Sequence, residues 1–529
     1  MLARLSALVV ALGPLLALPT LVSGQCTTPG LIQCVSSGQS PDYELCTAGG
    51  NWIAMQCGPL TVCQTIQQTI ACVLASSVNT NTNTNTNTNT GPSSSTGFAY
   101  RSAPNYGNGK NVGIVAYWPN WAQYTRPEHN PDVLDLSKVS VVNYAFLNVN
   151  KDGTLQSFDA WADFGGSSPN PPFALDPWSG HKGIYNLNYV AREKYPNLRT
   201  VISVGGWSGS VHFSDMASSD ASIATFVTSI KSFMDQFQFD GVDLDWEYPA
   251  GGGLPCNTHR PEDPANFVKL VKALRQALGK DRIISMASSG VVSHYVYNNH
   301  NYLKDIVAEL SYMQVMVYDL YGSWVPYADF NAPLNNPGPS DPQRPSANYQ
   351  FGTQLSIASS MTDLVNLGIA KKSIVGGLSF LSAAGSTNGL FQLCKLPNGQ
   401  TQDPNHPQVC PPITGDALDA IWTDPCGSSS VTGVWMYYNL RKQQVLTAPT
   451  TPAAGWSRHY WNFAQSSTLF DGTRFIAYDD TTSIQAKSQY YMSGGFGGVM
   501  IWEISEDYQN ELLNSITSVC RLHMPAFGS

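Results

Sequence analysis

The sequence predicts an α/β fold in which a parallel (β/α)8 barrel follows a small disulfide-rich module. Two observations carry most of this prediction. Short β-rich runs alternate with amphipathic helical segments over residues 107–522, which is typical of a closed parallel barrel. Six of the 11 cysteines fall between Cys26 and Cys72, ahead of that region. A length of 529 residues also leaves room for more than one domain.

Residues 1–24 have the pattern of a secretory signal peptide. An early Arg is followed by an apolar run and then by the small residues Ser23 and Gly24, where we expect cleavage. A membrane anchor is the alternative, but Pro14 and Pro19 interrupt the run and no cluster of charges flanks it. No later stretch reaches the roughly 18 uninterrupted apolar residues of a membrane span. We therefore expect a secreted, extracellular protein, free or associated with a cell wall, with no membrane partner.

Residues 25–75 form the Cys-rich module. Six cysteines in so short a segment predict three disulfides, because a module of this size cannot build a full hydrophobic core. The pairing stays open, and a zinc site is disfavoured because no C-x-x-C pair or partnering histidine occurs there. The six are Cys26, Cys34, Cys46, Cys57, Cys63 and Cys72. Beyond the module, five further cysteines leave at least one thiol unpaired or intermolecular.

Residues 76–106 form an Asn/Thr/Ser-rich linker, which has nothing to bury and is expected to act as a flexible tether. The overall composition is acidic and poor in charge, with a net charge of −9 and 12% charged residues. Such a surface argues against nucleic acid as a partner. Aromatic residues make up 11% of the chain, a supply that also suits stacking on sugar rings.

The large region, residues 107–522, is expected to contain eight strands with helical segments between most of them. It exceeds the usual barrel of about 250 residues. Most of the surplus lies between the seventh and eighth strands, at about residues 379–497, where we expect an α+β insertion. The expected strands are Val112–Tyr117, Val139–Leu147, Thr200–Gly205, Gly241–Glu247, Ile283–Ala287, Tyr312–Tyr318, Ser373–Leu378 and Gly498–Trp502.

The fourth expected strand lies in "FDGVDLDWEYP", which concentrates carboxylates in an apolar stretch. Side chains on a strand alternate between faces, so Asp243, Asp245 and Glu247 share one face and the apolar residues between them share the other. In a barrel the acidic face points into the lumen, with Glu247 at the carboxyl end of the strand, where barrel enzymes place their chemistry. Asp240 falls outside the alternation and is expected in the turn that precedes the strand.

Three carboxylates stacked in a lumen repel one another and lose water, which raises pKa values. At least one should hold a proton near neutral pH, and a terminal Glu in that state is a general acid. The alternative is an acidic strand end that faces solvent and has no catalytic role. The neighbouring Phe, Trp, Tyr and Pro residues disfavour a solvent-exposed position. A metal site is disfavoured too, because carboxylates along one strand do not easily converge on one ion. We expect no cofactor and no metal.

The strand matches D-x-x-D-x-D-x-E and resembles the signature of glycoside hydrolase family 18, whose best-known members are chitinases. Further segments resemble the same family in the same order along the chain. The similar segments are "VAYWPNWAQY", "VISVGGWSG", "MQVMVYDLYGSW" and "FIAYDDTTSIQAKSQYYMSGGFGGVMIWEISEDY". The resemblance covers essentially the whole large region and implies a TIM barrel enzyme that hydrolyses glycosidic bonds.

The resemblance also implies roles for the carboxylates. Glu247 would protonate the glycosidic oxygen. The family uses no carboxylate nucleophile, because the N-acetyl carbonyl oxygen of the substrate attacks the anomeric carbon and the configuration is retained. Asp245 would orient the acetamido group and balance positive charge, and Asp243, deeper in the lumen, would share a proton with Asp245.

Other residues are expected to touch the sugar chain. Tyr318 and Asp319 would hydrogen-bond the acetamido group, Trp502 would floor the site, and Trp207 and Trp121 would be stacking platforms on opposite sides. The same resemblance places Tyr117, Gly206, Tyr248 and Met316 at the substrate site. The chain departs from the family at its seventh strand, "GGLSFLSAAG", which lacks the usual Tyr and Arg.

The N-terminal module, with "CTAGGNWIAMQC" at its centre, resembles the small family 19 chitin-binding modules. Trp52 or Tyr43 would stack on a sugar, although either could instead form the minimal core, and a stalk without binding is the alternative.

The sequence therefore predicts a secreted, monomeric chitinase acting on chitin and chito-oligosaccharides. An endo-β-N-acetylglucosaminidase acting on N-glycans and a non-catalytic chitin-binding lectin are the rival interpretations. The long insertion favours a groove for a linear chain, and the presence of Glu247 argues against a lectin.

Overall fold

The computed structural model describes parts of residues 21–74 and most of residues 111–523. The gaps in the second range are residues 167, 176–181, 323–324, 336–354, 388–389, 396–399, 401–402, 404–407 and 409–411. The chain divides into two units, residues 1–99 and 100–529. Most of the expected signal peptide, the whole expected linker and Cys26, Cys57 and Cys410 lie outside the described residues.

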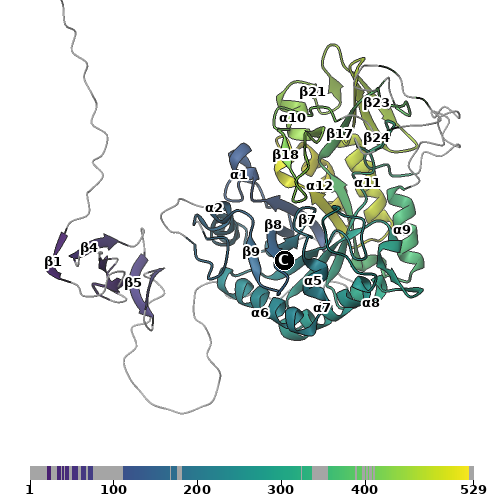
Figure 1. The fold of residues 1–529 in the computed structure, drawn as a ribbon. Coiled ribbons are helices and arrows are strands. Elements are labelled where there is room, and N and C mark those ends of the chain that lie inside the picture. Colours follow the sequence, from purple (N-terminus) through teal and green to yellow (C-terminus); the bar gives the residue numbers. More distant parts are fainter. Residues whose placement is uncertain are drawn as a thin grey trace, which may run out of the picture. The chain divides into compact units, whose positions relative to one another are not determined.

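The second unit is built on a closed barrel of eight parallel strands (Figure 1). Each strand pairs with the next along the chain, and the eighth returns to the first. The strands are β7 (Gly113–Pro119), β8 (Val141–Val149), β10 (Arg199–Gly205), β11 (Gly241–Asp245), β12 (Ile283–Ser289), β15 (Tyr312–Met316), β16 (Ile374–Ser379) and β26 (Gly498–Trp502). The predicted (β/α)8 barrel is confirmed. Each of the eight strands overlaps its expected range, although the fourth and sixth end two residues earlier than expected, at Asp245 and Met316.

Helices cover the outside of the barrel (Figure 1). Their apolar faces and the outward side chains of the strands share one large buried cluster, whereas a smaller cluster fills the lumen. The longer helices are α6 (Asp220–Phe237), α7 (Asp263–Leu278), α9 (Ile357–Asn366), α11 (Thr481–Ser493) and α12 (Glu511–His523). Shorter ones are α1 (Ala122–Thr125), α2 (Ala160–Phe164), α3 (Gly183–Tyr185), α4 (Arg192–Lys194), α5 (Phe213–Ala217) and α8 (Leu303–Val307). The short strand β9 (Leu155–Ser157) pairs with β8 in the antiparallel direction.

In its described residues, the insertion between β16 and β26 contains a five-stranded antiparallel sheet, one short helix and two small hairpins. The hairpins are the pair of β18 (Trp422–Thr423) with β19 (Ser429–Ser430) and the pair of β21 (Leu446–Ala448) with β22 (Thr451–Pro452). The sheet runs in the order β20-β17-β25-β24-β23. Its strands are β17 (Leu381–Ser386), β20 (Val434–Met436), β23 (Ser457–Trp461), β24 (Ser466–Phe470) and β25 (Arg474–Tyr478), and its helix is α10 (Tyr437–Lys442). Helix α11, inside the range expected for the insertion, packs on β16 and β26 and belongs with the barrel.

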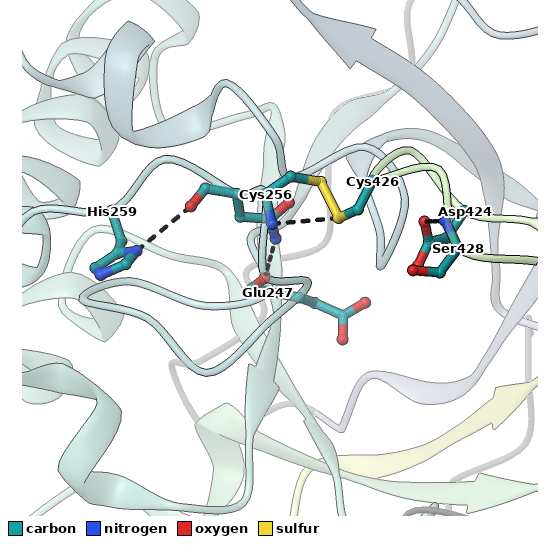
Figure 2. The surroundings of a disulfide bond; sticks show 7 residues. Glu247, Cys256, His259, Asp424, Cys426 and Ser428 are labelled. Carbon is teal, nitrogen blue, oxygen red and sulfur yellow. Dashed lines mark hydrogen bonds between the residues drawn. A yellow bond between two sulfur atoms is a disulfide. The ribbon is translucent and has the colours of Figure 1, made fainter.

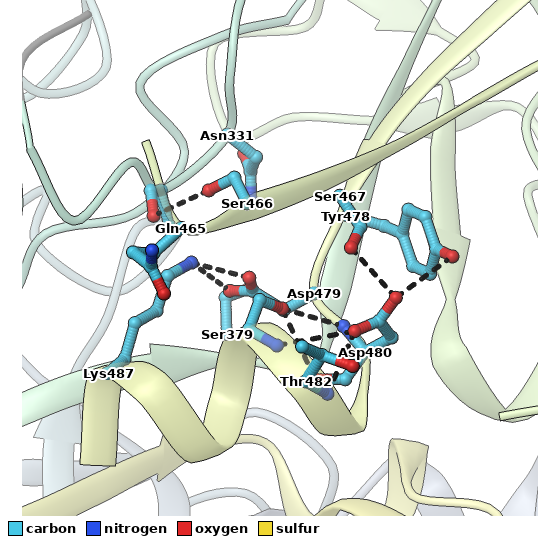
Figure 3. A network of polar contacts seen from close by, with 12 residues as sticks. Asn331, Ser379, Gln465, Ser466, Ser467, Tyr478, Asp479, Asp480, Thr482 and Lys487 are labelled. Atoms are coloured by element: carbon cyan, nitrogen blue, oxygen red, sulfur yellow. Dashed lines mark hydrogen bonds and ion pairs between the residues drawn. The ribbon is translucent and has the colours of Figure 1, made fainter. Parts of the chain in front are cut away.

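A buried polar network joins the insertion to the barrel where β25 leads into α11 (Figure 3). Lys487 Nζ on α11 donates to Asp479 Oδ2 at 2.6 Å, and both side chains are buried. The next residue, Asp480, caps α11 by accepting from the Thr482 and Ser483 backbone N–H groups. Arg458 Nη2 lies 2.6 Å from Asp480 Oδ2. Each carboxylate of this junction is therefore paired with its own cation.

The first unit contains a four-stranded antiparallel sheet and a two-stranded hairpin. Its strands are β1 (Leu21–Gln25), β2 (Ile32–Cys34), β3 (Asp42–Cys46), β4 (Asn51–Gln56), β5 (Thr61–Ile66) and β6 (Thr69–Leu74). Cys34 is disulfide-bonded, and Cys63 stands opposite Cys72 in the β5–β6 register. Tyr43 lies on β3 and Trp52 on β4, and their side chains are outside the described part. Among the described residues, no helix has both the length and the apolar character that crossing a membrane requires.

The cysteines of the second unit are partly paired. Cys256, in the segment after β11, forms a disulfide with Cys426 of the insertion, 170 residues away (Figure 2). Cys394 is disulfide-bonded as well. Cys520 on α12 is a free, buried thiol, which confirms the expectation of at least one unpaired cysteine.

Candidate active site

Strand β11 carries Asp243 and Asp245 at the centre of the barrel, and Glu247 follows two residues after the strand ends. Asp243, Asp245 and Glu247 are 0%, 3% and 9% exposed, and all three alternate with outward-facing apolar residues. On the outward side, Trp246 stacks on Phe213 with ring centroids 5.3 Å apart. The outward side chains pack among the helices, so the strand cannot shift by one residue without burying acids in an apolar core. The alternation therefore fixes the acidic ladder in the lumen.

Asp243, the deepest of the three, is enclosed by hydrogen-bond donors from neighbouring strands. Tyr117 Oη and Ser203 Oγ donate to its Oδ2 at 2.7 and 2.8 Å. Ser285 Oγ and Gln314 Nε2 donate to its Oδ1 at 2.7 and 2.9 Å. Burial raises the pKa of Asp243, and these four donors lower it again by favouring the charged form. No cation supplies any of these bonds.

Asp245, one step up the ladder, has the opposite environment. Its Oδ1 is buried and has no hydrogen-bond partner. Burial raises its pKa well above the ordinary value, and the charges of Glu247 and Asp243 raise it further. A buried acceptor without a donor is costly, so this oxygen is a place where a bound molecule with an N–H or O–H group gains a hydrogen bond.

Glu247 lies just beyond the carboxyl end of β11. Burial raises its pKa from 4.5 to about 7, the Tyr248 side chain opposes this, and the negative charge of Asp319 adds to it. Its backbone is held on both sides, because its N–H donates to Ser210 Oγ at 2.9 Å and its carbonyl accepts from Asn257 Nδ2 at 3.0 Å. A carboxyl group with a pKa near 7 can both give and take a proton at neutral pH.

The end of β15 brings three more of the expected residues to the mouth of the barrel. Met316 is half-buried against the lumen cluster. Tyr318 is 9% exposed, and burial followed by the charge of Asp319 raises its pKa well above the ordinary value, so its hydroxyl keeps its proton. Asp319 has φ = 55°, a left-handed conformation that Asp tolerates better than most residues. It turns the chain at the rim and lies exposed.

Aromatic rings form one wall of the site around Trp502. Phe146 stacks on Trp502 at 5.7 Å between centroids, and Tyr117 meets its edge at 5.4 Å. Trp121 lies 6.4 Å from the same ring and is 44% exposed. The Tyr117 hydroxyl is engaged by Asp243, so the phenol ring, and not its hydroxyl, is what this residue adds to the wall.

The end of β10 explains why two glycines precede Trp207. A Cβ on Gly205 would lie 2.2 Å from the Asp245 carbonyl oxygen, and one on Gly206 would lie 2.8 Å from the Phe146 ring. Both glycines also have positive φ values. The chain can therefore turn sharply beside the ladder, and it presents Trp207 at 43% exposure.

Some residues that the sequence singled out, and some that it missed, have supporting roles. Asp240 forms a buried ion pair with Arg192 at 2.9 Å, so it braces the start of the strand and takes no part in the lumen. Tyr248 packs on His294 with centroids 4.9 Å apart. The sequence interpretation missed Ser285 and Gln314, the donors to Asp243, and Phe146, which stacks on Trp502. Their only signal was a polar or aromatic residue at a lumen-facing position of a strand.

Among the described residues, no cluster of three or more His, Cys, Asp or Glu side chains is arranged to hold a metal ion. The site is instead a set of buried carboxyl groups beside an aromatic wall.

Comparison with known proteins now bears on this geometry. The profile of glycosyl hydrolases family 18 matches residues 113–507, which contain every strand of the barrel. The chain belongs to this family. Chitinase A1 of Niallia circulans is 30% identical over 448 residues, covering 76% of this chain and 58% of that protein. Endochitinase 1 of Metarhizium robertsii is 29% identical over 424 residues, covering 77% and 85% of the two chains.

A solved structure is also similar to this chain. Chitinase ChiA74 from Bacillus thuringiensis superposes with a TM-score of 0.63 at 28% identity, covering 79% of this chain and 71% of that one. The match to the family profile begins at residue 113, so the N-terminal Cys-rich module has no counterpart in that profile. The chain spans little more than half the length of the first of these relatives.

Proposed function

We propose that the protein is a secreted chitinase that cleaves β-1,4-linked N-acetylglucosamine polymers with retention of configuration. The observation that carries the proposal is the Asp245 side-chain oxygen that has no hydrogen-bond partner, one step below Glu247 on the same face. The pKa of Glu247 itself is about 7. An acetamido N–H supplies the donor that Asp245 lacks, and the glycosidic oxygen is the natural acceptor for the Glu247 proton. Family membership and the names of the relatives support the same substrate class.

In the first step, Glu247 transfers its proton to the glycosidic oxygen while the bond from that oxygen to C1 breaks. The acetamido carbonyl oxygen of the same sugar forms a new bond to C1 and gives an oxazolinium ion. Asp245 accepts the acetamido N–H and balances the positive charge, and Tyr318 donates its hydroxyl proton to the acetamido group. Asp243, whose charged form four donors favour against burial, takes up the proton of Asp245, so that Asp245 carries negative charge while the oxazolinium ion exists.

In the second step, the Glu247 carboxylate takes a proton from water, and the resulting hydroxide attacks C1 from the face that the leaving group vacated. The C1–oxygen bond of the oxazolinium ion breaks and the acetamido group reforms. Two displacements at the same carbon give net retention. No second carboxylate is needed as nucleophile, which fits a ladder whose three acids come from one short segment of the chain, residues 243–247.

The aromatic residues are proposed to hold the sugar chain. Trp502 lies under the sugar that reacts, and Trp121 and Trp207, each more than 40% exposed, offer faces to sugars farther along. Asp319 and Met316 line the mouth beside them.

Outside the barrel, we propose that residues 1–24 direct secretion and that residues 25–75 bind solid chitin through Trp52 or Tyr43. Deletion of residues 25–75 should weaken adsorption to solid chitin and leave turnover of soluble oligomers nearly intact. Unchanged adsorption would reduce the module to a stalk.

The decisive assay measures release of oligomers from colloidal chitin by the wild type and by Glu247→Gln. We expect release by the wild type and a loss of about 10²- to 10⁴-fold in the variant, the usual contribution of a general acid. Equal release by both proteins would exclude Glu247 as the acid. A wild type that binds chitin without cleaving it would be a lectin, and one that trims a high-mannose glycoprotein instead would be an endo-β-N-acetylglucosaminidase.

A further inference from the structure

The disulfide between Cys256 and Cys426 joins two parts of the chain that the barrel places on opposite sides of its mouth. Cys256 lies in the segment after β11, the fourth strand. Cys426 belongs to the insertion that leaves the seventh strand and returns to the eighth. In a closed barrel of eight strands, the fourth and eighth strands face each other.

The insertion rests on the loops that follow the first, sixth and eighth strands. Arg126, after β7, donates to Met436 Sδ at 3.1 Å. Ala328, after β15, donates its N–H to the Gln392 carbonyl at 2.9 Å. The segment that carries Cys256 is instead held by the loop after β10, on the other side of the mouth. The Thr258 N–H donates to the carbonyl of Val211 in that loop at 3.1 Å. The disulfide is thus a covalent bond from one rim of the mouth to the other.

On the insertion side, the bond is made by a projecting hairpin of β18 (Trp422–Thr423) and β19 (Ser429–Ser430). The base of the hairpin is fixed, since Asp419 accepts the N–H groups of Gly415, Thr432 and Gly433 at 2.7 to 3.0 Å. Among the described residues, the side-chain hydrogen bonds of the tip stay within the hairpin, apart from the N–H of Cys256 that donates to Cys426 Sγ at 3.2 Å. The disulfide is what holds the tip in place.

On the barrel side, the bond is next to the proposed acid. Asn257, the neighbour of Cys256, donates to the Glu247 carbonyl at 3.0 Å (Figure 2). In Figure 2 the disulfide lies between the loop after Glu247 and the hairpin turn of Asp424 and Ser428, with the Glu247 carboxylate pointing toward the hairpin side. The hairpin also leaves apolar side chains in solvent, with Ile421 74% and Trp422 43% exposed.

We propose that the hairpin and its disulfide form a strap across the mouth of the barrel, under which a linear sugar chain is threaded. This rests on the proposed chitinase function. The strap prevents a bound polymer from leaving sideways, so after one cleavage the chain slides and is cut again. Trp422 offers an additional stacking face on the strap. The substrate class is therefore a long, unbranched polymer entered from an end, in preference to a short or branched glycan.

The test compares wild type with the double variant Cys256→Ser/Cys426→Ser on insoluble chitin. Successive cuts on one chain release soluble products, whereas single cuts leave new reducing ends on the solid. We expect the ratio of soluble to insoluble reducing ends to fall about threefold or more without the strap, because the chain now escapes between cuts. Turnover of a fluorogenic N-acetyl-chitobioside serves as the reference for correctly folded enzyme.

Two further measurements keep the test decisive if the double variant folds poorly. Mild reduction of folded wild type, with the opened disulfide identified by mass spectrometry, should lower the same ratio, because Cys256 is exposed. Trp422→Ala should raise the KM for long oligomers about three- to tenfold. Val133→Ala, an exposed apolar residue in the segment before β8, is the control and should leave it unchanged.

The outcomes separate the two proposals. A wild type inactive on both the fluorogenic substrate and chitin would refute the proposed function and the strap with it. An active enzyme whose ratio is the same with the bond open and closed would refute the strap alone.

Discussion

Two groups of buried carboxylates in this chain differ in what surrounds them. In the ladder of Asp243, Asp245 and Glu247, none of the three forms an ion pair with a Lys or Arg side chain of the described residues, and burial raises all three pKa values. At the junction of insertion and barrel, Asp479 meets Lys487 at 2.6 Å (Figure 3). Asp480 meets Arg458 there, also at 2.6 Å. Burial raises the pKa of Asp479 too, but the charge and hydrogen bond of Lys487 lower it again, and the pair holds two elements together. An unpaired carboxylate keeps a proton that chemistry can use.

The sharpest test of this difference removes the cation of the junction. Lys487→Met leaves Asp479 buried without its partner, and loss of one member of a buried pair costs about 3–5 kcal/mol of unfolding free energy. Chemical denaturation should show this loss. The double variant Asp479→Leu/Lys487→Met should recover most of it, and equal instability of the two variants would mean that packing, not charge, holds the junction.

The corresponding change in the ladder should affect rate instead of stability. Asp245→Asn removes the negative charge that Asp245 takes on when its proton moves to Asp243. The positive transition state is then no longer balanced, so we expect kcat to fall by about 10²- to 10³-fold. Because Asp245 Oδ1 has no partner to lose, the unfolding free energy should stay within about 1 kcal/mol of wild type. A large loss of stability would contradict the contrast between the two groups.

The pH dependence of stability separates the groups in another way. Glu247 titrates at 4.5 when unfolded and at about 7 when folded, so the unfolded state loses its proton first as pH rises. Its contribution is fully present below pH 4.5 and is lost as pH rises through about 7, a total of about 3 kcal/mol. As pH rises from 5 to 8, the Glu247→Gln variant should therefore lose less stability in thermal melts than the wild type loses. Parallel curves for the two proteins would contradict the raised pKa.

The smallest expected effect comes from the rim. The charge of Asp319 raises the pKa of Glu247, so Asp319→Asn should move the alkaline limb of the kcat/KM profile to lower pH, by less than about one unit. A profile measured on a soluble fluorogenic substrate gives the limb directly. A shift to higher pH would show that another group controls Glu247.

The sequence was sufficient for the barrel and for the acidic ladder, because both depend on periodicity. Alternation on β11 determines which side chains face the lumen whatever lies beyond the strand. The same count put Glu247 at the carboxyl end, although it was expected on the strand and β11 ends two residues earlier, at Asp245.

Other features depend on contacts between distant segments, which periodicity does not encode. Ser285 and Gln314 are ordinary polar residues until the closed barrel brings them to Asp243. The pairing of Cys256 with Cys426 requires the insertion to reach back across 170 residues. Helix α11 has the same local pattern whether it belongs to the insertion or to the barrel, and only its packing on β16 and β26 decides. The roles assigned to the site residues stay predictions.

The free thiol of Cys520 gives this protein a built-in reporter. The side chain is buried on α12, and burial raises its pKa to about 12, so in the folded protein it exists as an unreactive thiol. A maleimide or an aromatic disulfide reagent added to the intact protein should therefore modify it only when α12 leaves the barrel. The labelling rate would then measure how often the C-terminal helix opens, without any engineered probe.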